Sequence, residues 1–188
     1  MDQDFLRERS ALPLGVQDEK IRQEMLDKIS EVAANGDSIG AILECGISGF
    51  PAGLGSPMFD GLENRISSAI FAIPAVKGIE FGLGFDFCKM TGSEANDEMY
   101  YDENGVVKTY TNHNGGILGG ISNGMPIIFT TIIKPTPSIA KPQRTVNLKK
   151  EKDDILEIKG RHDSCIAVRA LPVVENMTAI ALVDSLYE

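Results

Sequence analysis

The feature that most restricts the fold of this 188-residue chain is a glycine cluster that runs directly into an apolar segment. Five glycines fall within residues 115–124, GGILGGISNG, and residues 126–133 follow as PIIFTTII. Ordered glycine loses more backbone entropy than other residues, so such a cluster indicates positive φ angles or a ligand lying against the main chain. The apolar segment is short and β-branched, which predicts a buried strand. A tight turn and a ligand contact both remain open for the glycines.

Hydrophobic periodicity predicts three helices. Residues 18–34 carry apolar side chains at helical spacing. A second helix is expected to begin at Ser56 and Pro57, where a hydroxyl can cap the helix and proline can take its first position. A third is expected to begin near Pro172 and is apolar on most sides, so we expect sheet and partner chains to enclose it.

Alternating apolar residues predict two further strands. They occur at every second position over residues 39–47 and again over residues 79–85, where Phe81, Leu83 and Phe85 are expected in the core. Residues 91–114 are polar and acidic and are expected to form a long loop away from the core. The resulting order of helices and strands predicts an α+β fold in one domain, residues 1–188.

Charge and cysteine usage exclude several classes of protein. Asp and Glu total 27 against 18 Lys and Arg, and a net charge of -9 argues against binding to nucleic acid or to a membrane surface. The N-terminus is too polar for a signal peptide, and no apolar run is long enough to span a bilayer. Cys45, Cys88 and Cys165 lack paired spacing and are expected as reduced, small core residues. We therefore expect a soluble, cytoplasmic protein.

The KPTPS segment combines donor groups with stiff backbone. Lys134 offers an ammonium group, and Thr136 and Ser138 offer hydroxyls. Pro135 and Pro137 hold the main chain extended between them. Such a segment suits a phosphate group or the edge of a flavin, although Lys134 also fits a solvated surface charge.

The GRHDSC segment, residues 160–165, carries two groups with possible chemistry. Arg161 can form a forked contact with a phosphate or carboxylate, or lie on the surface as a solvated charge. Asp163 can accept a proton, or can pair structurally with Arg161 or Arg169. His162 is interpreted as a hydrogen-bonded structural residue. The acidic GSEANDE segment lacks histidine or cysteine at metal-ligand spacing, so no metal site is expected there, and it is interpreted as ordering a loop or a subunit contact.

On these motifs the chain resembles the chorismate synthase family. FPAGLGSPMFDGLENRISSAIFAIPAVKGIEFGLGF, GSEANDE, TNHNGGILGGISNGMPI, KPTPS, GRHDSC and RALPVVENM occur in that family's order and cover nearly all of the chain. The resemblance implies a β-α-β sandwich to which this chain contributes antiparallel strands and packed helices. Family members are roughly twice as long, and their first half carries a G-E-S-H-G segment, a second catalytic histidine, substrate-binding arginines and an arginine-serine-serine flavin segment. The chain is therefore expected to correspond to the C-terminal half.

The resemblance also implies a function. The family eliminates phosphate from 5-enolpyruvylshikimate 3-phosphate in a 1,4-anti reaction that gives chorismate in the shikimate pathway. It depends on reduced FMN, with NAD(P)H as a reductant in some members, and forms homotetramers. An alternative is that this chain alone is a non-catalytic scaffold that oligomerises and binds flavin weakly or not at all.

Site residues carry over by motif. The resemblance places Asp163 as an aspartate assisting proton transfer near flavin N5, and Arg161 in contact with flavin or substrate. The remaining flavin-contacting residues are expected to be Pro74, Ala75, Gly119, Lys134, Pro135, Thr136, Pro137 and Ser138. The catalytic histidines of the family do not map onto His113 or His162. Asn114 departs from the family, which usually has a small residue there.

Overall fold

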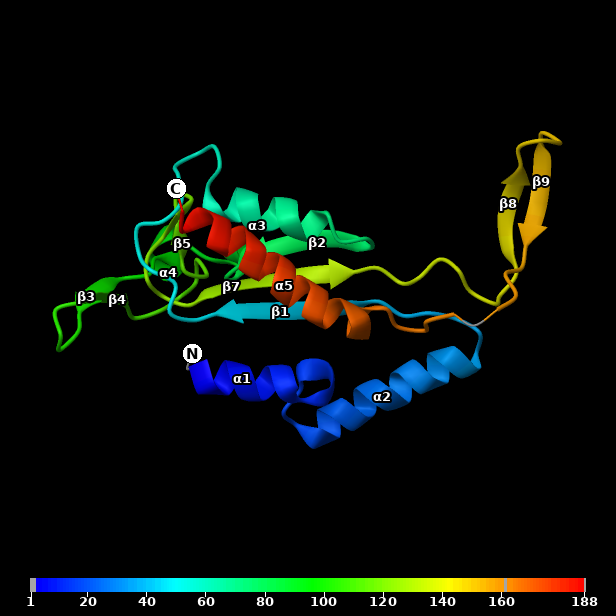
Figure 1. Cartoon of the computed structure of the whole chain (residues 1–188), viewed down its shortest axis with the longest axis horizontal. Helices are drawn as coiled ribbons and strands as arrows, with labels where there is room; N and C mark the ends of the chain where they lie inside the picture. Colours follow the sequence, from blue (N-terminus) through cyan, green and yellow to red (C-terminus); the bar gives the residue numbers. More distant parts are fainter. Residues whose placement is uncertain (1–2, 161, 188) are drawn as a thin grey trace.

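A three-stranded antiparallel sheet forms the centre of the computed structural model, which describes residues 3–160 and 162–187 (Figure 1). Its strands are β1 (Ala41–Ile47), β7 (Ile127–Ile133) and β2 (Val76–Phe81), in the order β1-β7-β2. The predicted buried strand is therefore confirmed as the central one. Its register places Phe129 opposite Cys45 on one side and opposite Phe81 on the other.

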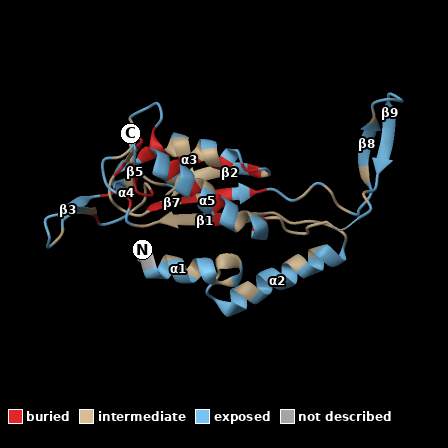
Figure 2. Ribbon diagram, viewed as in Figure 1, coloured by how far each residue is buried: buried red, intermediate tan, exposed pale blue. Residues whose placement is uncertain are grey.

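Two helices, α3 (Leu62–Phe71) and α5 (Ala167–Ser185), cover one face of this sheet (Figures 1 and 2). Each turns an apolar stripe inward, and the buried side chains of helices and sheet form one cluster. Its largest fully buried apolar members are Phe129, Leu62, Ile66, Ile70, Ile117, Ile127 and Ile133. The combination of an antiparallel sheet with packed helices confirms the α+β class.

The N-terminal helices lie alongside β1, below it in Figure 1. They are α1 (Gln3–Ala11), the short 3-10 helix η1 (Pro13–Gly15) and α2 (Glu19–Ala34). The predicted helix over residues 18–34 is confirmed, since the Asp18 carboxylate caps α2 by accepting a hydrogen bond from the Ile21 N–H at 3.0 Å. Ile21 is 50% exposed, so the apolar stripe of α2 is only partly covered.

Small hairpins and turns occupy the connections. At one end of the sheet lie η2 (Gly84–Lys89), α4 (Gly92–Ala95), the hairpin of β3 (Met99–Tyr101) and β4 (Val107–Thr109), and the hairpin of β5 (Ile117–Leu118) and β6 (Ile121–Ser122). At the opposite end, β8 (Gln143–Asn147) and β9 (Lys152–Leu156) form a hairpin that projects away from the core (Figure 1). Every residue of β9 is exposed, which explains why no hydrophobic alternation revealed this hairpin.

Two predicted element starts are wrong. The second helix begins at Leu62 with Gly61 as its N-cap, because Met58 and Asp60 adopt left-handed φ angles of 65° and 58° that break any helix from Ser56. The last helix begins at Ala167, so Pro172 lies inside it.

Two core assignments are also wrong. Phe85 is 82% exposed, because β2 ends at Phe81 and the chain then turns into η2. Cys88, in the same short helix, is exposed as well. Cys45 and Cys165 do pack against the core cluster, as expected. Burial raises the pKa of the Cys45 thiol to about 11.

Candidate functional site

The expected site residues fall at the two ends of β7. Residues 74–75, 134–138 and 162–165 lie at the end where β7 finishes, here called the proline end. The glycine cluster, with residues 111–114 before it, lies where β7 begins, here called the glycine end. The seven residues of β7 separate the two ends by roughly 20 Å at the usual rise of a strand. Gly119 therefore does not lie beside Lys134 within one chain.

Two of the expected flavin-contacting segments meet at the proline end. The Lys134 N–H donates a hydrogen bond of 2.9 Å to the Ala75 carbonyl, and Val76 pairs with Ile133 just inside the sheet. Ala75 has a left-handed φ of 73°, a conformation that costs a non-glycine residue about 1–2 kcal/mol. Backbone strain of this kind concentrates at binding and catalytic sites.

Residues just before β1 connect the other two segments of the proline end. The Ser38 hydroxyl donates a 2.6 Å hydrogen bond to the Thr136 carbonyl, and the Ile39 N–H donates one of 2.7 Å to the Ser164 carbonyl. The main chains of KPTPS and GRHDSC are therefore both anchored to residues 38–39. Sequence reasoning missed Ser38, since nothing in its local pattern reports a contact 98 residues away.

The side chains of the GRHDSC segment have structural partners. Asp163 Oδ2 lies 2.9 Å from Arg169 Nη1, and this arginine side chain is 78% exposed, so the pair is a weak surface ion pair. His162 Nε2 lies 3.3 Å from the Ile158 carbonyl oxygen, in agreement with the structural interpretation. Arg161 lies outside the described residues.

The proline end offers polar groups that fit a flavin. Lys134 is exposed, and Thr136 Oγ1 is one of the buried side-chain atoms that lack a hydrogen bond within the described part of the chain. A buried hydroxyl without a partner is costly, so a polar ligand atom that forms a hydrogen bond with Thr136 Oγ1 would be stabilised there.

At the glycine end, adjacent glycines serve different purposes. Gly119 and Gly120 form the two-residue turn between β5 and β6 with φ angles of +59° and +86°, as a type I′ hairpin requires. A Cβ atom at Gly120 would lie 2.2 Å from the Ser56 carbonyl oxygen, whereas one at Gly119 would meet no atom within 4 Å. Gly115 and Gly116 likewise lie against main chain. The turn requires both glycines, and the close approach of Ser56 further restricts Gly120. Gly119 leaves an open main-chain surface that a planar ligand can approach.

Asp97, from the GSEANDE segment, fixes the chain that leads into this hairpin. Its side chain is 1% exposed and accepts hydrogen bonds from Thr111 Oγ1 (2.6 Å), His113 N (2.7 Å), Asn114 N (3.0 Å) and Asn114 Nδ2 (2.9 Å). Burial by itself would raise the pKa of Asp97, but these hydrogen bonds outweigh it and lower the pKa to about 2. The loop-ordering role expected for GSEANDE is confirmed, and Asn114 supplies two of the four bonds.

Replacing Asp97 with asparagine is expected to lower the free energy of unfolding by about 3 kcal/mol near neutral pH, because an amide N–H₂ would face the Asn114 donors. The pH-dependent part of this stabilisation, about 2 kcal/mol, is complete above the ordinary pKa of 3.8 and is lost as the pH falls toward 2. The difference in the free energy of unfolding between wild type and Asp97→Asn, measured by urea unfolding, should therefore become smaller as the pH falls from 3.8 toward 2. The neighbouring exposed Glu98→Gln is the control. A difference in the free energy of unfolding that stays constant with pH would contradict the claim that Asp97 is ionised in the folded chain.

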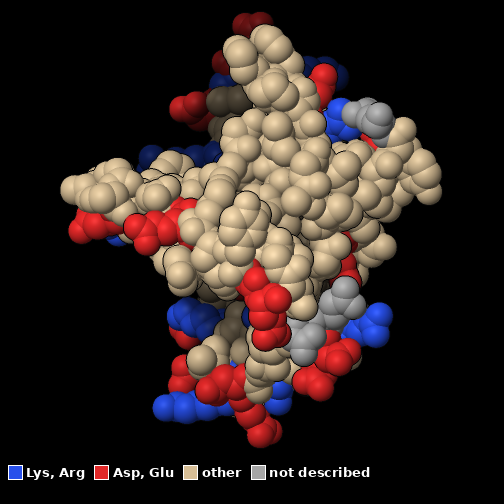
Figure 3. Space-filling view, turned by 90° about the vertical axis from the view of Figure 1, so that its left-hand side faces the viewer, with Lys and Arg blue, Asp and Glu red and all other residues tan. Residues whose placement is uncertain are grey.

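The charged side chains at the glycine end are mainly acidic. In Figure 3, which faces this end, uncharged surface makes up most of the upper and middle parts, with acidic clusters at the left and centre, and mixed acidic and basic groups lie lower down, over the N-terminal helices. This face therefore offers little to attract a multiply charged anion.

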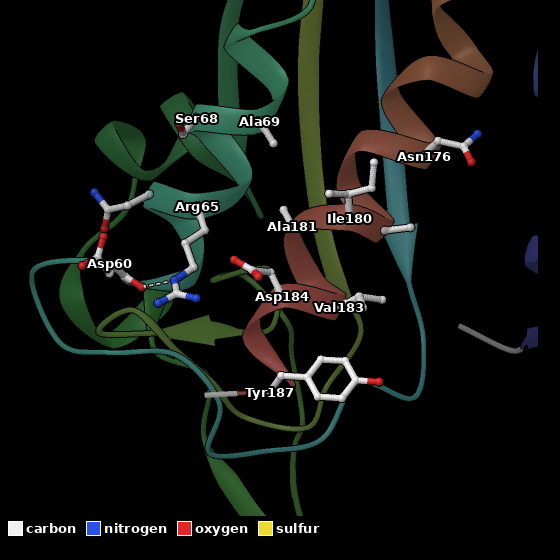
Figure 4. Close-up of a pocket in the computed structure, with 12 residues that line it drawn as sticks. Asp60, Arg65, Ser68, Ala69, Asn176, Ile180, Ala181, Val183, Asp184 and Tyr187 are labelled. Atoms are coloured by element: carbon white, nitrogen blue, oxygen red, sulfur yellow. Dashed lines mark hydrogen bonds between the residues drawn. The ribbon is translucent and has the colours of Figure 1, made fainter.

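A groove of about 970 Å³ lies on the outer side of α3 and α5 (Figure 4). Arg65 of α3 donates from Nε to the Asp60 carbonyl at 2.8 Å, and Asp184 of α5 lies across the groove from it. None of the expected site residues lines this groove.

Comparison with known proteins decides the family. A family model described as chorismate synthase matches residues 3–187. The chain belongs to the chorismate synthase family. Chorismate synthase from Thermococcus gammatolerans is 50% identical over 169 residues, which cover 90% of this chain and 47% of that protein. Chorismate synthase from Lachnoclostridium phytofermentans is 51% identical over 174 residues, covering 93% and 47%.

A crystal structure of chorismate synthase also matches, with a TM-score of 0.77 and 30% identity over 96% of this chain and 47% of that one. The chain therefore spans about half the length of the chorismate synthases it matches. Within the described part of this chain, no helix is long and apolar enough to cross a bilayer.

Proposed function

We propose that this chain is the C-terminal part of a chorismate synthase, a lyase that eliminates phosphate from 5-enolpyruvylshikimate 3-phosphate to give chorismate. Full activity would require the half of the family fold that the chain does not span. The observation that carries the proposal is the contact of Lys134 with the strained Ala75, because it joins two motifs that the family resemblance assigns to one flavin site.

Reduced FMN, when bound, supplies an electron-rich ring next to the substrate. At the proline end, Pro74 and Ala75 would form one wall of its site and residues 134–138 another. The Lys134 ammonium would meet an anionic group, and the Thr136 hydroxyl would gain the hydrogen bond that it lacks. Pro135 and Pro137 would limit the reorganisation of this wall on binding.

Asp163 and Arg161 would act beside this wall. Asp163 Oδ2 is engaged by Arg169, which leaves Oδ1 to accept and return a proton near the flavin. Arg161 would contact flavin or substrate. We further propose one domain over residues 1–188, assembly into a homotetramer, a cytoplasmic location and reduction of the flavin by NAD(P)H in the pathway to aromatic amino acids.

The second candidate, a non-catalytic flavin-binding or oligomerisation scaffold, is favoured by one observation. The charged side chains on the described face of the glycine end are mainly acidic, and the chain as a whole carries a net charge of -9. A substrate with a phosphate and two carboxylates would therefore depend on cations supplied from elsewhere.

The two candidates differ in turnover. The purified chain is expected to quench FMN fluorescence but to release no phosphate from 5-enolpyruvylshikimate 3-phosphate with reduced FMN under anaerobic conditions. Adding the N-terminal half of the Thermococcus gammatolerans enzyme as a separate polypeptide is expected to restore phosphate release. Binding of FMN without release in the mixture would favour the scaffold. Release by the chain alone would contradict the need for the second half.

A further inference from the structure

The imidazole ring of His113 lies at the glycine end with its Nδ1 atom pointing into the protein. His113 Nδ1 is buried, has no hydrogen bond and lies 3.9 Å from Asp97 Oδ1. The His113 backbone is fixed on both sides, since its N–H donates to Asp97 Oδ1 at 2.7 Å and its carbonyl accepts from the Leu83 N–H at 2.8 Å. The position of the ring is therefore set by the same carboxylate that orders the loop.

This arrangement selects a tautomer. Asp97 is a pure acceptor, with two hydrogen bonds on each carboxylate oxygen. A lone pair on Nδ1 would face this negative charge, whereas an N–H there would point its positive end toward it. The neutral ring should therefore carry its proton on Nδ1 and leave Nε2 as the acceptor.

The outer nitrogen is available for a ligand. The His113 side chain is 24% exposed, and only Nδ1 of its ring is among the buried atoms without a partner. No side chain or main-chain group in residues 3–160 or 162–187 bonds to Nε2.

A second observation points to the same region. Asn112 Oδ1 and Asn123 Nδ2 are also buried without a hydrogen bond, and these two residues flank Gly115 and Gly116 in the folded chain. Three polar side chains with unmet hydrogen-bonding capacity therefore surround the base of the hairpin that carries Gly119. Structural clusters in folded proteins normally satisfy such groups, so unmet capacity favours a binding role.

We propose that Asp97 is a positioning residue that orients His113, and that His113 Nε2 accepts a hydrogen bond from a hydroxyl or ring N–H of the ligand bound over Gly119. The inference rests on the proposed function. Because β7 separates Gly119 from the proline end of its own chain by roughly 20 Å, the ligand over Gly119 would be a flavin held by the proline end of a neighbouring copy in the proposed homotetramer. Reduced FMN carries donors of both kinds. His113 would thus be a ligand-binding histidine additional to those the family resemblance implies.

Heteronuclear NMR of the imidazole nitrogens tests the orientation without any ligand. The chain has two histidines, so His162→Asn leaves the His113 signals alone in the spectrum. The neutral ring is expected as the Nδ1–H tautomer, and Asp97→Asn is expected to lose this preference. Thr111→Val removes one hydrogen bond to Asp97 but keeps the carboxylate, so it should retain the Nδ1–H preference. It is the control for a general loss of structure in Asp97→Asn. A predominant Nε2–H tautomer in the wild-type chain would overturn the orientation.

Titration with reduced FMN tests the binding role. The His113 nitrogen signals are expected to shift, and His113→Ala is expected to weaken FMN affinity about fivefold to tenfold, as for the loss of one hydrogen bond. Tyr101→Ala, on the exposed face of β3, should leave affinity unchanged. FMN binding with unshifted His113 signals would overturn the inference and leave the proposed function standing. The absence of any FMN binding by fluorescence, in the chain and in its mixture with the complementary half, would overturn both.

Discussion

Replacing Gly120 with alanine is expected to lower the free energy of unfolding by about 3–5 kcal/mol. A Cβ atom there would lie 2.2 Å from the Ser56 carbonyl oxygen and 3.1 Å from Gly61 Cα, and neither main-chain atom can move without displacing the start of α3. The left-handed φ of +86° adds strain for any side chain. Urea unfolding followed by circular dichroism would measure the loss.

The adjacent Gly119→Ala is the matched control. It introduces the same methyl group at a similar φ of +59° but meets no atom within 4 Å, so only about 1–2 kcal/mol of backbone strain is expected. Its larger effect should be on FMN binding if the open main chain serves the flavin. Equal destabilisation by the two substitutions would contradict the separation of a packed glycine from an open one.

Replacing Phe129 with alanine is the second change with a large expected effect, about 3–5 kcal/mol of stability. Phe129 is fully buried in the middle of the central strand, and its ring packs against that of Phe81 with centroids 5.8 Å apart. Phe129 belongs to the buried cluster that the helices and the sheet share, so its removal leaves a cavity that the surrounding backbone cannot close. The loss should appear as a lower urea midpoint with an unchanged m value.

Phe85→Ala removes the same ring from a position that the sequence also assigned to the core. Phe85 is 82% exposed, so the expected change in the free energy of unfolding is within about 0.5 kcal/mol. A loss comparable to that of Phe129→Ala would show that Phe85 is buried in solution, for example between subunits.

The sequence predicted the helices and strands that carry a clear local pattern of apolar residues. Residues 127–133 form a short run of apolar and β-branched residues that buries one face of the strand, and α2 has a stripe and a cap that can be read from the sequence. The hairpin of β8 and β9 was missed because exposed, charged strands have no hydrophobic alternation. Phe85 was misassigned because a period of two continued by chance beyond the end of β2.

The candidate site was predicted only in part, for a different reason. The motifs identified residues 74–75 and 134–138, and these do meet. The separation of Gly119 from them, roughly 20 Å, the anchoring by Ser38 and the role of Asp97 all depend on contacts between distant parts of the chain. A single sequence contains no local signal for such contacts.

The outline of the molecule affects how its assembly must be measured. Hairpins extend from opposite ends of the sheet, so the chain is long for its 20.3 kDa (Figure 1). An elongated monomer diffuses slowly and elutes from a gel-filtration column ahead of a sphere of equal mass. Elution volume alone would therefore suggest a dimer, and light scattering or analytical ultracentrifugation is needed to count the subunits.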